Sequence, residues 1–317
     1  MVSDNEFQIP VIKFSTDSKD LDRGTEGWHN LCKRVREACE NYGCFELVYD
    51  KMPIQSRAET FSGIRQLFDL PLDIKKKNVS PKPNSGYLGQ IAAVPLYESF
   101  GIDDAFNYDS LKSFSELMWP NDHDLFLPAV TVMLKSLDGL NHLIGTMILD
   151  GFGLGEKMES IMKCEPLLRL MKYQAPPSGE YMNGLVPHTD MGSYTLLCDD
   201  QVPGLEIETK DGQWIRLSPS PNSFIFFVGD LLMAWSNGRM RSARHRVMMS
   251  GDKDRYSLAI FGAPVDGSII KAPKELIDEE HPQVFKEFDY LDFVKFRNSE
   301  EGRATDSEMQ MFVFAGI

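Results

Sequence analysis

Residues 194–228 read YTLLCDDQVPGLEIETKDGQWIRLSPSPNSFIFFV, a series of short apolar and β-branched runs divided by turn-forming residues. The dividing segments are rich in Asp, Gly, Pro and Asn, which favour the backbone conformations of tight turns. The same pattern of short strands and turns extends over residues 168–264. Evenly spaced short strands of this kind predict a β-sandwich, a barrel or a jelly roll.

On either side of this region the pattern becomes helical. Apolar residues recur at helical spacing, most clearly between residues 127 and 150, and helices are predicted at 27–42, 54–69 and 127–150. Short runs at residues 9–12 and 44–48 predict strands, and residues 79–90 predict a loop. The tail beyond residue 282 is polar and aromatic and is expected to be partly helical. No flexible linker separates these parts, so we expect a mainly β fold with flanking helices rather than two independent domains.

The composition excludes several classes of protein. The chain has 317 residues and a net charge of −14, which disfavours binding to nucleic acid or to an anionic membrane surface. It has no predicted secretory signal and no uninterrupted apolar stretch long enough to span a membrane. Its five cysteines form no CxxC pair, which predicts free thiols in a reducing compartment and argues against a disulfide scaffold or a zinc ribbon. We therefore expect a cytoplasmic protein.

Three residues could form a metal site. His188 and Asp190 stand two apart in the segment VPHTD (residues 186–190), so in an extended chain their side chains project to one face. His245 lies 55 residues after Asp190, at the predicted start of another strand. Two histidines and one carboxylate make the facial triad of non-haem Fe(II) enzymes, which leaves coordination positions open. The same three donors also suit a catalytic zinc ion, and a His-x-Asp triplet alone is common at protein surfaces.

A second group of residues could bind an anion. Arg255 and Ser257 share one face of a predicted strand ten residues after His245. A guanidinium beside a hydroxyl suits a carboxylate, because the planar fork can bind both oxygens while the hydroxyl adds a third hydrogen bond. Tyr173, on a neighbouring predicted strand, could reach the same anion. The sequence thus predicts a metal site with a carboxylate-binding site beside it.

In this order and spacing, His188-x-Asp190, His245 and Arg255-x-Ser257 resemble the plant iron(II)- and 2-oxoglutarate-dependent dioxygenases. The resemblance covers nearly the whole chain, including the opening at residues 9–14 and the motifs Tyr42-Gly43-Cys44-Phe45, Gly204-Leu205-Glu206, Gly212-x-Trp214, Pro219-x-Pro221, Gly229-Asp230 and Ser236-Asn237-Gly238. Residues 69–71, 78–80, 86–88 and 97–101 are most similar to the AOP-like clade, which includes glucosinolate side-chain oxidases. Met171 departs from the pattern, since the family often has Asn there.

The resemblance implies a double-stranded β-helix, or jelly-roll, core at residues 165–265. It also implies an N-terminal region of non-haem dioxygenases at 8–105 and a C-terminal extension at 266–317 that could cover the active site. His188, Asp190 and His245 would bind Fe(II), and Arg255, Ser257 and Tyr173 would bind 2-oxoglutarate. The expected reaction couples O2 and the decarboxylation of 2-oxoglutarate to oxidation of a small specialised plant metabolite by hydroxylation, desaturation, ring closure or demethylation. Ascorbate is the expected reductant, and the enzyme is expected to be a monomer.

The substrate and several alternatives stay open on the sequence alone. Candidate substrate-pocket residues are Tyr87, Tyr97, Phe100, Phe227 and Trp235. An iron-dependent oxidase that needs no 2-oxo acid is disfavoured by Arg255-x-Ser257, and a halogenase is disfavoured because Asp190 occupies the position that chloride would need. A zinc hydrolase would leave the Arg-x-Ser pair without a role, and a catalytically silent binding protein would leave the triad without one. The basic cluster over residues 239–246 is expected to be a solvated hairpin with local ion pairs.

Overall fold

Two facing β-sheets form the centre of the molecule. The computed structural model describes residues 8–52, 54–82, 85–89, 91–120, 125–155 and 164–317. The main sheet has eight strands in the order β1 (Val11–Phe14), β2 (Cys44–Tyr49), β10 (Ser223–Val228), β7 (Tyr194–Asp199), β12 (Arg255–Pro264), β5 (Cys164–Tyr173), β4 (Tyr97–Ile102) and β3 (Gly86–Leu88). The second sheet has the order β6 (Met182–His188), β11 (His245–Met249), β8 (Leu205–Glu208) and β9 (Trp214–Arg216). These sheets form the predicted jelly-roll core.

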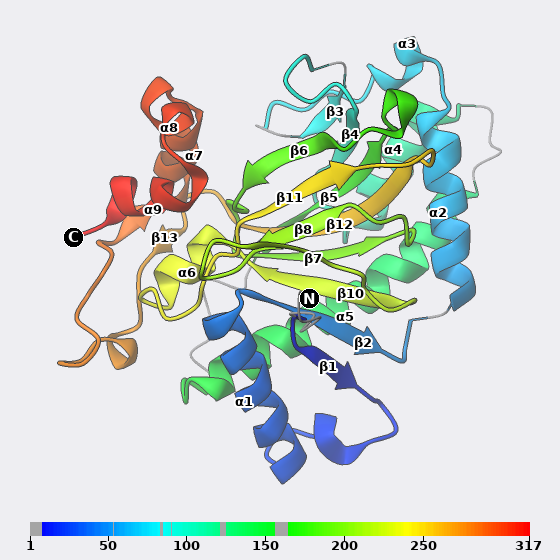
Figure 1. Cartoon of the computed structure of the whole chain (residues 1–317). Helices are drawn as coiled ribbons and strands as arrows, with labels where there is room; N and C mark the ends of the chain where they lie inside the picture. The colour runs from blue at the N-terminus through cyan, green and yellow to red at the C-terminus, as the bar shows by residue number, and fades with distance from the viewer. Residues whose placement is uncertain (1–7, 53, 83–84, 90, 121–124, 156–163) are drawn as a thin grey trace, which may run out of the picture.

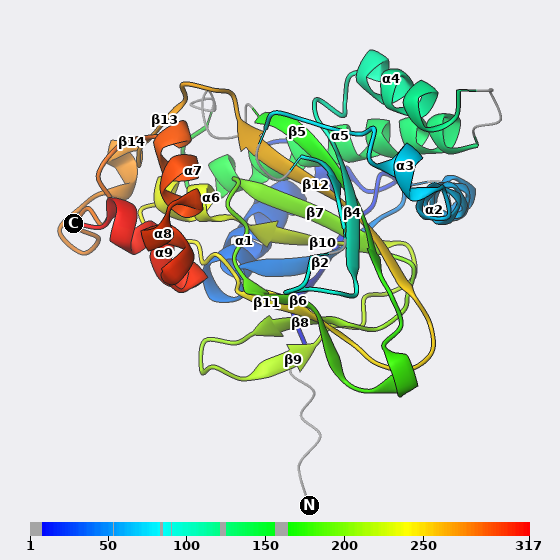
Figure 2. The ribbon, with the colours of Figure 1, turned by 90° about the horizontal axis from the view of Figure 1, so that it is seen from above.

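Helices cover the outer face of the main sheet. They are α1 (Glu26–Asn41), α2 (Ile54–Phe68), the short α3 (Leu72–Lys75), α4 (Tyr108–Met118) and α5 (Phe126–Gly151). Figure 2 shows α4 and α5 on one side of the main sheet and β8 and β9 on the other. The helices predicted at residues 27–42, 54–69 and 127–150 are confirmed, and the apolar stripe of α5 that includes Val130, Leu137 and Ile144 is buried.

The main sheet therefore has a hydrophobic core on each face. The larger core lies between the sheet and the helices, and the smaller one lies between the two sheets. Alternation along β5 shows the division, because Leu168 and Leu170 belong to the helix-side core while Met171 and Tyr173 belong to the inter-sheet core. Side chains at the inward positions therefore face the second sheet, where the predicted site residues lie.

The chain after the jelly roll gathers at one end of the sheets. A two-stranded sheet of β13 (Ile269–Ile270) and β14 (Phe288–Asp289) leads to α7 (Tyr290–Asn298), α8 (Glu300–Ala304) and α9 (Ser307–Ala315). Figure 1 shows these red helices beside the end of β6 and near the yellow helix α6 (Asp230–Trp235). No helix in the described part of the chain is long and apolar enough to cross a membrane.

The structure corrects two details of the sequence prediction. The predicted loop at residues 79–90 contains the short strand β3, which pairs with β4 at the sheet edge. The apolar run at residues 224–235 is divided at Gly229 into strand β10 and helix α6, so the β region is not composed of strands alone. Asn237 and Gly238 both have positive φ directly after α6, so this helix ends in a tight turn.

Candidate metal centre

The three predicted metal ligands meet at one end of the inter-sheet space. His188 is the last residue of β6 and pairs in register with His245, the first residue of β11. Asp190 Oδ1 lies 3.7 Å from His188 Nε2 and 3.8 Å from His245 Nε2. One ligand atom from each residue can be chosen so that all lie within 4.8 Å of one another. This donor set fits a facial triad, because a single ion could contact all three side chains while part of its coordination sphere stays open.

Hydrogen bonds fix the orientation of these ligands. His188 Nδ1 lies 2.9 Å from the Val186 carbonyl oxygen and His245 Nδ1 lies 3.1 Å from that of Ala243, so each Nδ1–H donates and each Nε2 is left as an acceptor. The Thr195 hydroxyl donates to Asp190 Oδ2 over 2.6 Å. Burial, and then the neighbouring His245 ring, lower the pKa of His188, which favours the neutral imidazole that a metal requires.

The loop that carries His188 and Asp190 is tied to the C-terminal helices through Asp230. Thr189, between the two ligands, donates to Asp230 Oδ2 over 3.2 Å. The other Asp230 oxygen accepts from Ser242 over 2.7 Å, and Arg297 of α7 forms an ion pair with Asp230 at 2.5 Å. Since Asp230 is almost fully buried, these bonds hold both ligand-bearing segments against the C-terminal part of the chain.

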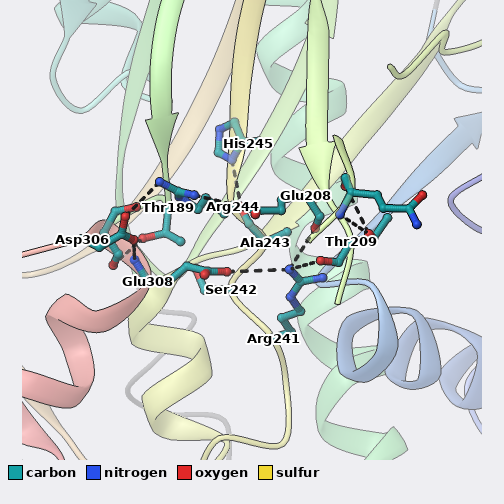
Figure 3. Close-up of polar contacts among 12 residues, drawn as sticks. Thr189, Glu208, Thr209, Arg241, Ser242, Ala243, Arg244, His245, Asp306 and Glu308 are labelled. Atoms are coloured by element: carbon teal, nitrogen blue, oxygen red, sulfur yellow. Dashed lines mark hydrogen bonds and ion pairs between the residues drawn. The ribbon is translucent and has the colours of Figure 1, made fainter. Parts of the chain in front are cut away.

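The basic cluster at residues 239–246 differs from the expected solvated hairpin. Ion pairs do form, but their partners lie far away in the sequence, as Figure 3 shows for Arg241 and Arg244. Arg244 bridges Glu208 of β8 and Asp306 at the start of α9, with both distances 2.9 Å, and Arg241 lies 3.7 Å from Glu308. The cluster therefore connects the segment before His245 to the C-terminal helices, which the local sequence pattern did not indicate.

The predicted carboxylate-binding residues meet on the inner face of the main sheet. Arg255 pairs in register with Tyr173 of β5, and its guanidinium carbon lies 5.5 Å from the centre of the Tyr173 ring. Ser257 is the next inward residue along β12, and all three side chains are buried. Burial raises the pKa of Tyr173 far above its usual range, so its phenol stays protonated and can donate a hydrogen bond.

Two donors at this position have no hydrogen-bond partner in the part of the chain that the structure describes. Arg255 Nε donates to the Val202 carbonyl oxygen over 3.1 Å and Nη2 donates to Asp199 over 2.7 Å. Within the described residues, Arg255 Nη1 and Ser257 Oγ are buried and form no hydrogen bond. Such unpaired buried donors are unfavourable, and a carboxylate placed between them would satisfy both. The residues therefore fit the distal carboxylate of 2-oxoglutarate.

Asp199 is a residue of this candidate site that the sequence pattern did not reveal. The pair Asp199-Asp200 resembles a turn in the sequence, and Asp200 does follow the end of β7. Asp199, however, is an inward residue of β7, paired in register with Ser257, and its carboxylate is buried against Arg255. The sequence did contain one indication of this position. Asp199 follows Leu197 by two residues, and residues two apart on a strand face the same side of the sheet, here the inter-sheet side.

The predicted pocket residues do not lie together. Tyr97 and Phe227 belong to the inter-sheet core: Tyr97 lies 5.4 Å from Tyr173, and Phe227 stacks on His245 at 4.6 Å between ring centres. Three residues pack instead against the helix-side core: Tyr87, Phe100 and Trp235. This corrects the expected set. Tyr97 and Phe100 are three residues apart on one strand and so face opposite sides of the sheet, while Tyr87 pairs with Phe100 and Trp235 lies on α6.

Comparison with known proteins identifies the family. Residues 164–264 match the 2OG-Fe(II) oxygenase superfamily, and residues 9–120 match the N-terminal region described as "non-haem dioxygenase in morphine synthesis". The chain is 41% identical over 314 residues to a probable 2-oxoglutarate-dependent dioxygenase, AOP1.2, of Arabidopsis thaliana, covering 96% of each protein. The chain belongs to the 2OG-Fe(II) oxygenase family. It is a 2-oxoglutarate-dependent dioxygenase of the AOP-like group, with Fe(II) and 2-oxoglutarate as cofactor and co-substrate.

Solved structures agree with this assignment. The dioxygenase for auxin oxidation of rice is 30% identical, with a TM-score of 0.83 over 97% of this chain and 100% of that one. The corresponding Arabidopsis thaliana dioxygenase, solved with 2-oxoglutarate, is 28% identical, with a TM-score of 0.78 over 87% of this chain and 100% of that one. The expected dioxygenase family is confirmed, and the comparisons give no support to a zinc hydrolase, a halogenase or a silent binding protein.

Proposed function

We propose that His188, Asp190 and His245 bind the Fe(II) of this dioxygenase and that Arg255, Ser257 and Tyr173 bind the distal carboxylate of 2-oxoglutarate. The observation that carries the proposal is the arrangement of two complementary incomplete sites on the inter-sheet face. One is a set of convergent metal donors, and the other is a pair of buried donors, Arg255 Nη1 and Ser257 Oγ, without a partner among the described residues. A 2-oxo acid can bind both, because its two ends carry different functional groups.

The residues divide the work of the reaction. Bound Fe(II) supplies the oxygen activation that couples decarboxylation of 2-oxoglutarate to oxidation of the substrate. Arg255 donates hydrogen bonds to the distal carboxylate and orients it, while Asp199 and the Val202 carbonyl hold the guanidinium in one rotamer. Thr195 orients the Asp190 carboxylate, and Phe227 packs on the His245 ring and limits its movement. Tyr97 and Phe227 are the proposed pocket residues, since both face the inter-sheet core.

The substrate is proposed to be a small specialised plant metabolite, oxidised by hydroxylation, desaturation, ring closure or demethylation. The similarity to AOP-like proteins and to dioxygenases for auxin oxidation supports this class. We also propose a cytoplasmic monomer that binds neither nucleic acid nor membranes, in keeping with the net charge of −14. The proposed regions are 8–105, the jelly-roll core at 165–265 and an extension at 266–317. The contact of Arg297 with Asp230 supports a role of that extension beside the metal centre.

The test is the stoichiometry of the reaction. Protein loaded with Fe(II) and ascorbate is supplied with a leaf metabolite extract, and oxygen uptake and succinate release are measured with and without 2-oxoglutarate. We expect both signals to require 2-oxoglutarate, and the Asp190→Ala variant to show neither. Oxygen uptake without any 2-oxo acid would favour an iron-dependent oxidase. Binding of extract components without oxygen uptake would favour a binding protein.

A further inference from the structure

Arg169 is a buried cation on the same inner face as the proposed site. It lies on β5 two residues before Met171 and four before Tyr173, so it shares their inward orientation. Its hydrogen bond confirms this direction, because Nη1 donates over 2.8 Å to the hydroxyl of Ser99, the inward neighbour of Tyr97 on β4. The whole residue is 7% exposed. Its charge is therefore held between the two sheets.

This guanidinium is incompletely satisfied. Nη2 is buried and has no hydrogen-bond partner among the described residues, and no carboxylate in those parts of the chain pairs with Arg169. Its register neighbour on β12 is Ala259, which offers no acceptor. One neutral hydroxyl is thus the side-chain partner of a fully charged group, since an arginine stays protonated in a protein.

The other buried arginines are satisfied differently. Arg57 donates to the backbone carbonyls of Asp199 and Ser223 and also lies against the Phe61 and Phe224 rings. Arg255 has the Asp199 carboxylate, so its charge is already balanced by the protein. Arg169 alone among these three lacks both an anion and a second acceptor in the described ranges of the chain. An unbalanced buried charge is strongly unfavourable unless something pairs with it, which indicates a ligand.

The position of Arg169 separates it from the site proposed for 2-oxoglutarate. Arg255 pairs with Tyr173 and Ser257 with Met171, whereas Arg169 is one inward step further along β5, paired with Ala259. The next inward step on β12 is Phe261, which pairs with Thr195, the residue that donates to Asp190. Each such step is about 7 Å. Arg169 therefore lies at a level between the carboxylate clamp and the metal ligands, where the substrate of this enzyme would bind.

We propose that Arg169 binds a carboxylate of the substrate, so that the dioxygenase acts on a small organic acid. This inference rests on the proposed function, because it takes the metal ligands and the Arg255 site as assigned above. The substrate carboxylate would accept hydrogen bonds from the free Nη2 and balance the buried charge. A neutral analogue with an amide in its place would leave that charge unbalanced, so the site discriminates between the two.

The test uses matched acid and amide probes. The protein is loaded with Mn(II) and saturated with 2-oxoglutarate, which gives a complex without turnover, and is titrated calorimetrically. The probes are phenylacetate against phenylacetamide and indole-3-acetate against indole-3-acetamide, each up to about 10 mM, the range in which fragment-sized ligands bind. We expect each acid to bind at least about tenfold more tightly than its amide in the parent protein. The ratio should fall to about one in Arg169→Met and recover in part in Arg169→Lys.

A stability measurement distinguishes a ligand-binding arginine from a structural one. Arg169→Met removes an unbalanced buried charge, so its unfolding midpoint in urea should equal or exceed that of the parent. Arg57→Met is the matched control, since it removes an equally buried arginine whose hydrogen bonds are satisfied. It should lower the midpoint and leave the acid preference unchanged. A lower midpoint for Arg169→Met, equal to that of the control, would make Arg169 structural and overturn the proposal.

The remaining outcomes are also decisive. Equal binding of acids and amides by the parent, an acid preference that survives in Arg169→Met, or no binding of either acid would each overturn the proposal. Titration of the same preparations with 2-oxoglutarate distinguishes a failure of the Arg169 proposal from a failure of the proposed function. Arg169→Met should bind 2-oxoglutarate within about twofold of the parent, whereas an Arg255 variant should not. Loss of 2-oxoglutarate binding in Arg169→Met would place Arg169 in the co-substrate site instead.

Discussion

Replacing Arg255 by methionine should lower the free energy of unfolding and also weaken 2-oxoglutarate binding, and the two effects can be measured separately. The Asp199 carboxylate, whose side chain is 4% exposed, loses its 2.7 Å ion pair and is left as an unpaired buried charge. Breaking a buried pair by removing one member lowers the free energy of unfolding by about 3–5 kcal/mol. That is a large part of the about 5–15 kcal/mol that holds a typical domain folded. Arg255→Met is therefore expected to be folded but clearly destabilised.

The effect on 2-oxoglutarate follows from the same contacts. Asp199 already balances much of the Arg255 charge, so the carboxylate of 2-oxoglutarate gains mainly the hydrogen bonds from Nη1 and Ser257. We therefore take the lower part of the range for a truncated buried charge pair, about 2–3 kcal/mol, which raises the dissociation constant about 30- to 150-fold. Binding of the metal should change little, because none of its ligands contacts Arg255.

The double variant Arg255→Met/Asp199→Asn separates the two effects. Removing the unpaired charge should restore more than half of the lost stability while leaving 2-oxoglutarate binding as weak as in the single variant. Urea unfolding measures the first quantity, and calorimetric titration of the Mn(II)-loaded protein measures the second. Arg65→Met is the control. In the parent protein Arg65 forms an ion pair with Asp200 over 2.9 Å, but the Arg65 side chain is 46% exposed. The free energy of unfolding of Arg65→Met should fall by at most about 1 kcal/mol, and this variant should bind 2-oxoglutarate as the parent protein does.

Two results would refute this reasoning. If Arg255→Met binds 2-oxoglutarate as tightly as the parent protein, the guanidinium does not hold the distal carboxylate. If the double variant is no more stable than the single one, Asp199 is not an unpaired charge in Arg255→Met, and the argument from burial is wrong.

Three further outcomes are expected. Asp190→Ala should abolish succinate formation and weaken Mn(II) binding while the free energy of unfolding in urea changes by less than about 1 kcal/mol, and normal turnover would show that Asp190 is not a ligand. Gly229→Ala should destabilise the fold by about 1–3 kcal/mol, because its Cβ would lie 2.1 Å from the Gly192 carbonyl oxygen; an unchanged urea midpoint would contradict this. None of the five cysteines, all of which lie in the described part of the chain, forms a disulfide, and burial raises their pKa values, to about 11 for Cys32 and Cys198 and to about 12 for Cys44 and Cys164. Since only the thiolate reacts, alkylation of the native protein at pH 8 should be at least about tenfold slower than that of the urea-unfolded protein, and equal rates would show that the thiols are accessible.

Much of the architecture was determined by the sequence itself. The helical spacing of α5 and the turn residues between the strands are local patterns, and they predicted the elements because each residue's face follows from its neighbours. The donors also could be identified locally, because His188 and Asp190 share a segment and Arg255 and Ser257 share a strand face. Even the separation of Tyr97 from Phe100 was implied by their odd spacing on one strand.

Tertiary structure decided how these local groups meet and which charges are balanced. The register of β6 with β11 places His245 beside His188, and β12 beside β7 gives Arg255 its Asp199 partner. The C-terminal helices supply partners for Arg241 and Arg244 that lie more than 60 residues further along the chain. Arg169 has the same kind of strand context as Arg255, yet no anion among the described residues pairs with it. Pairing depends on distances between strands remote in sequence, which no local pattern encodes, because ion pairing is set by proximity in space rather than by separation along the chain.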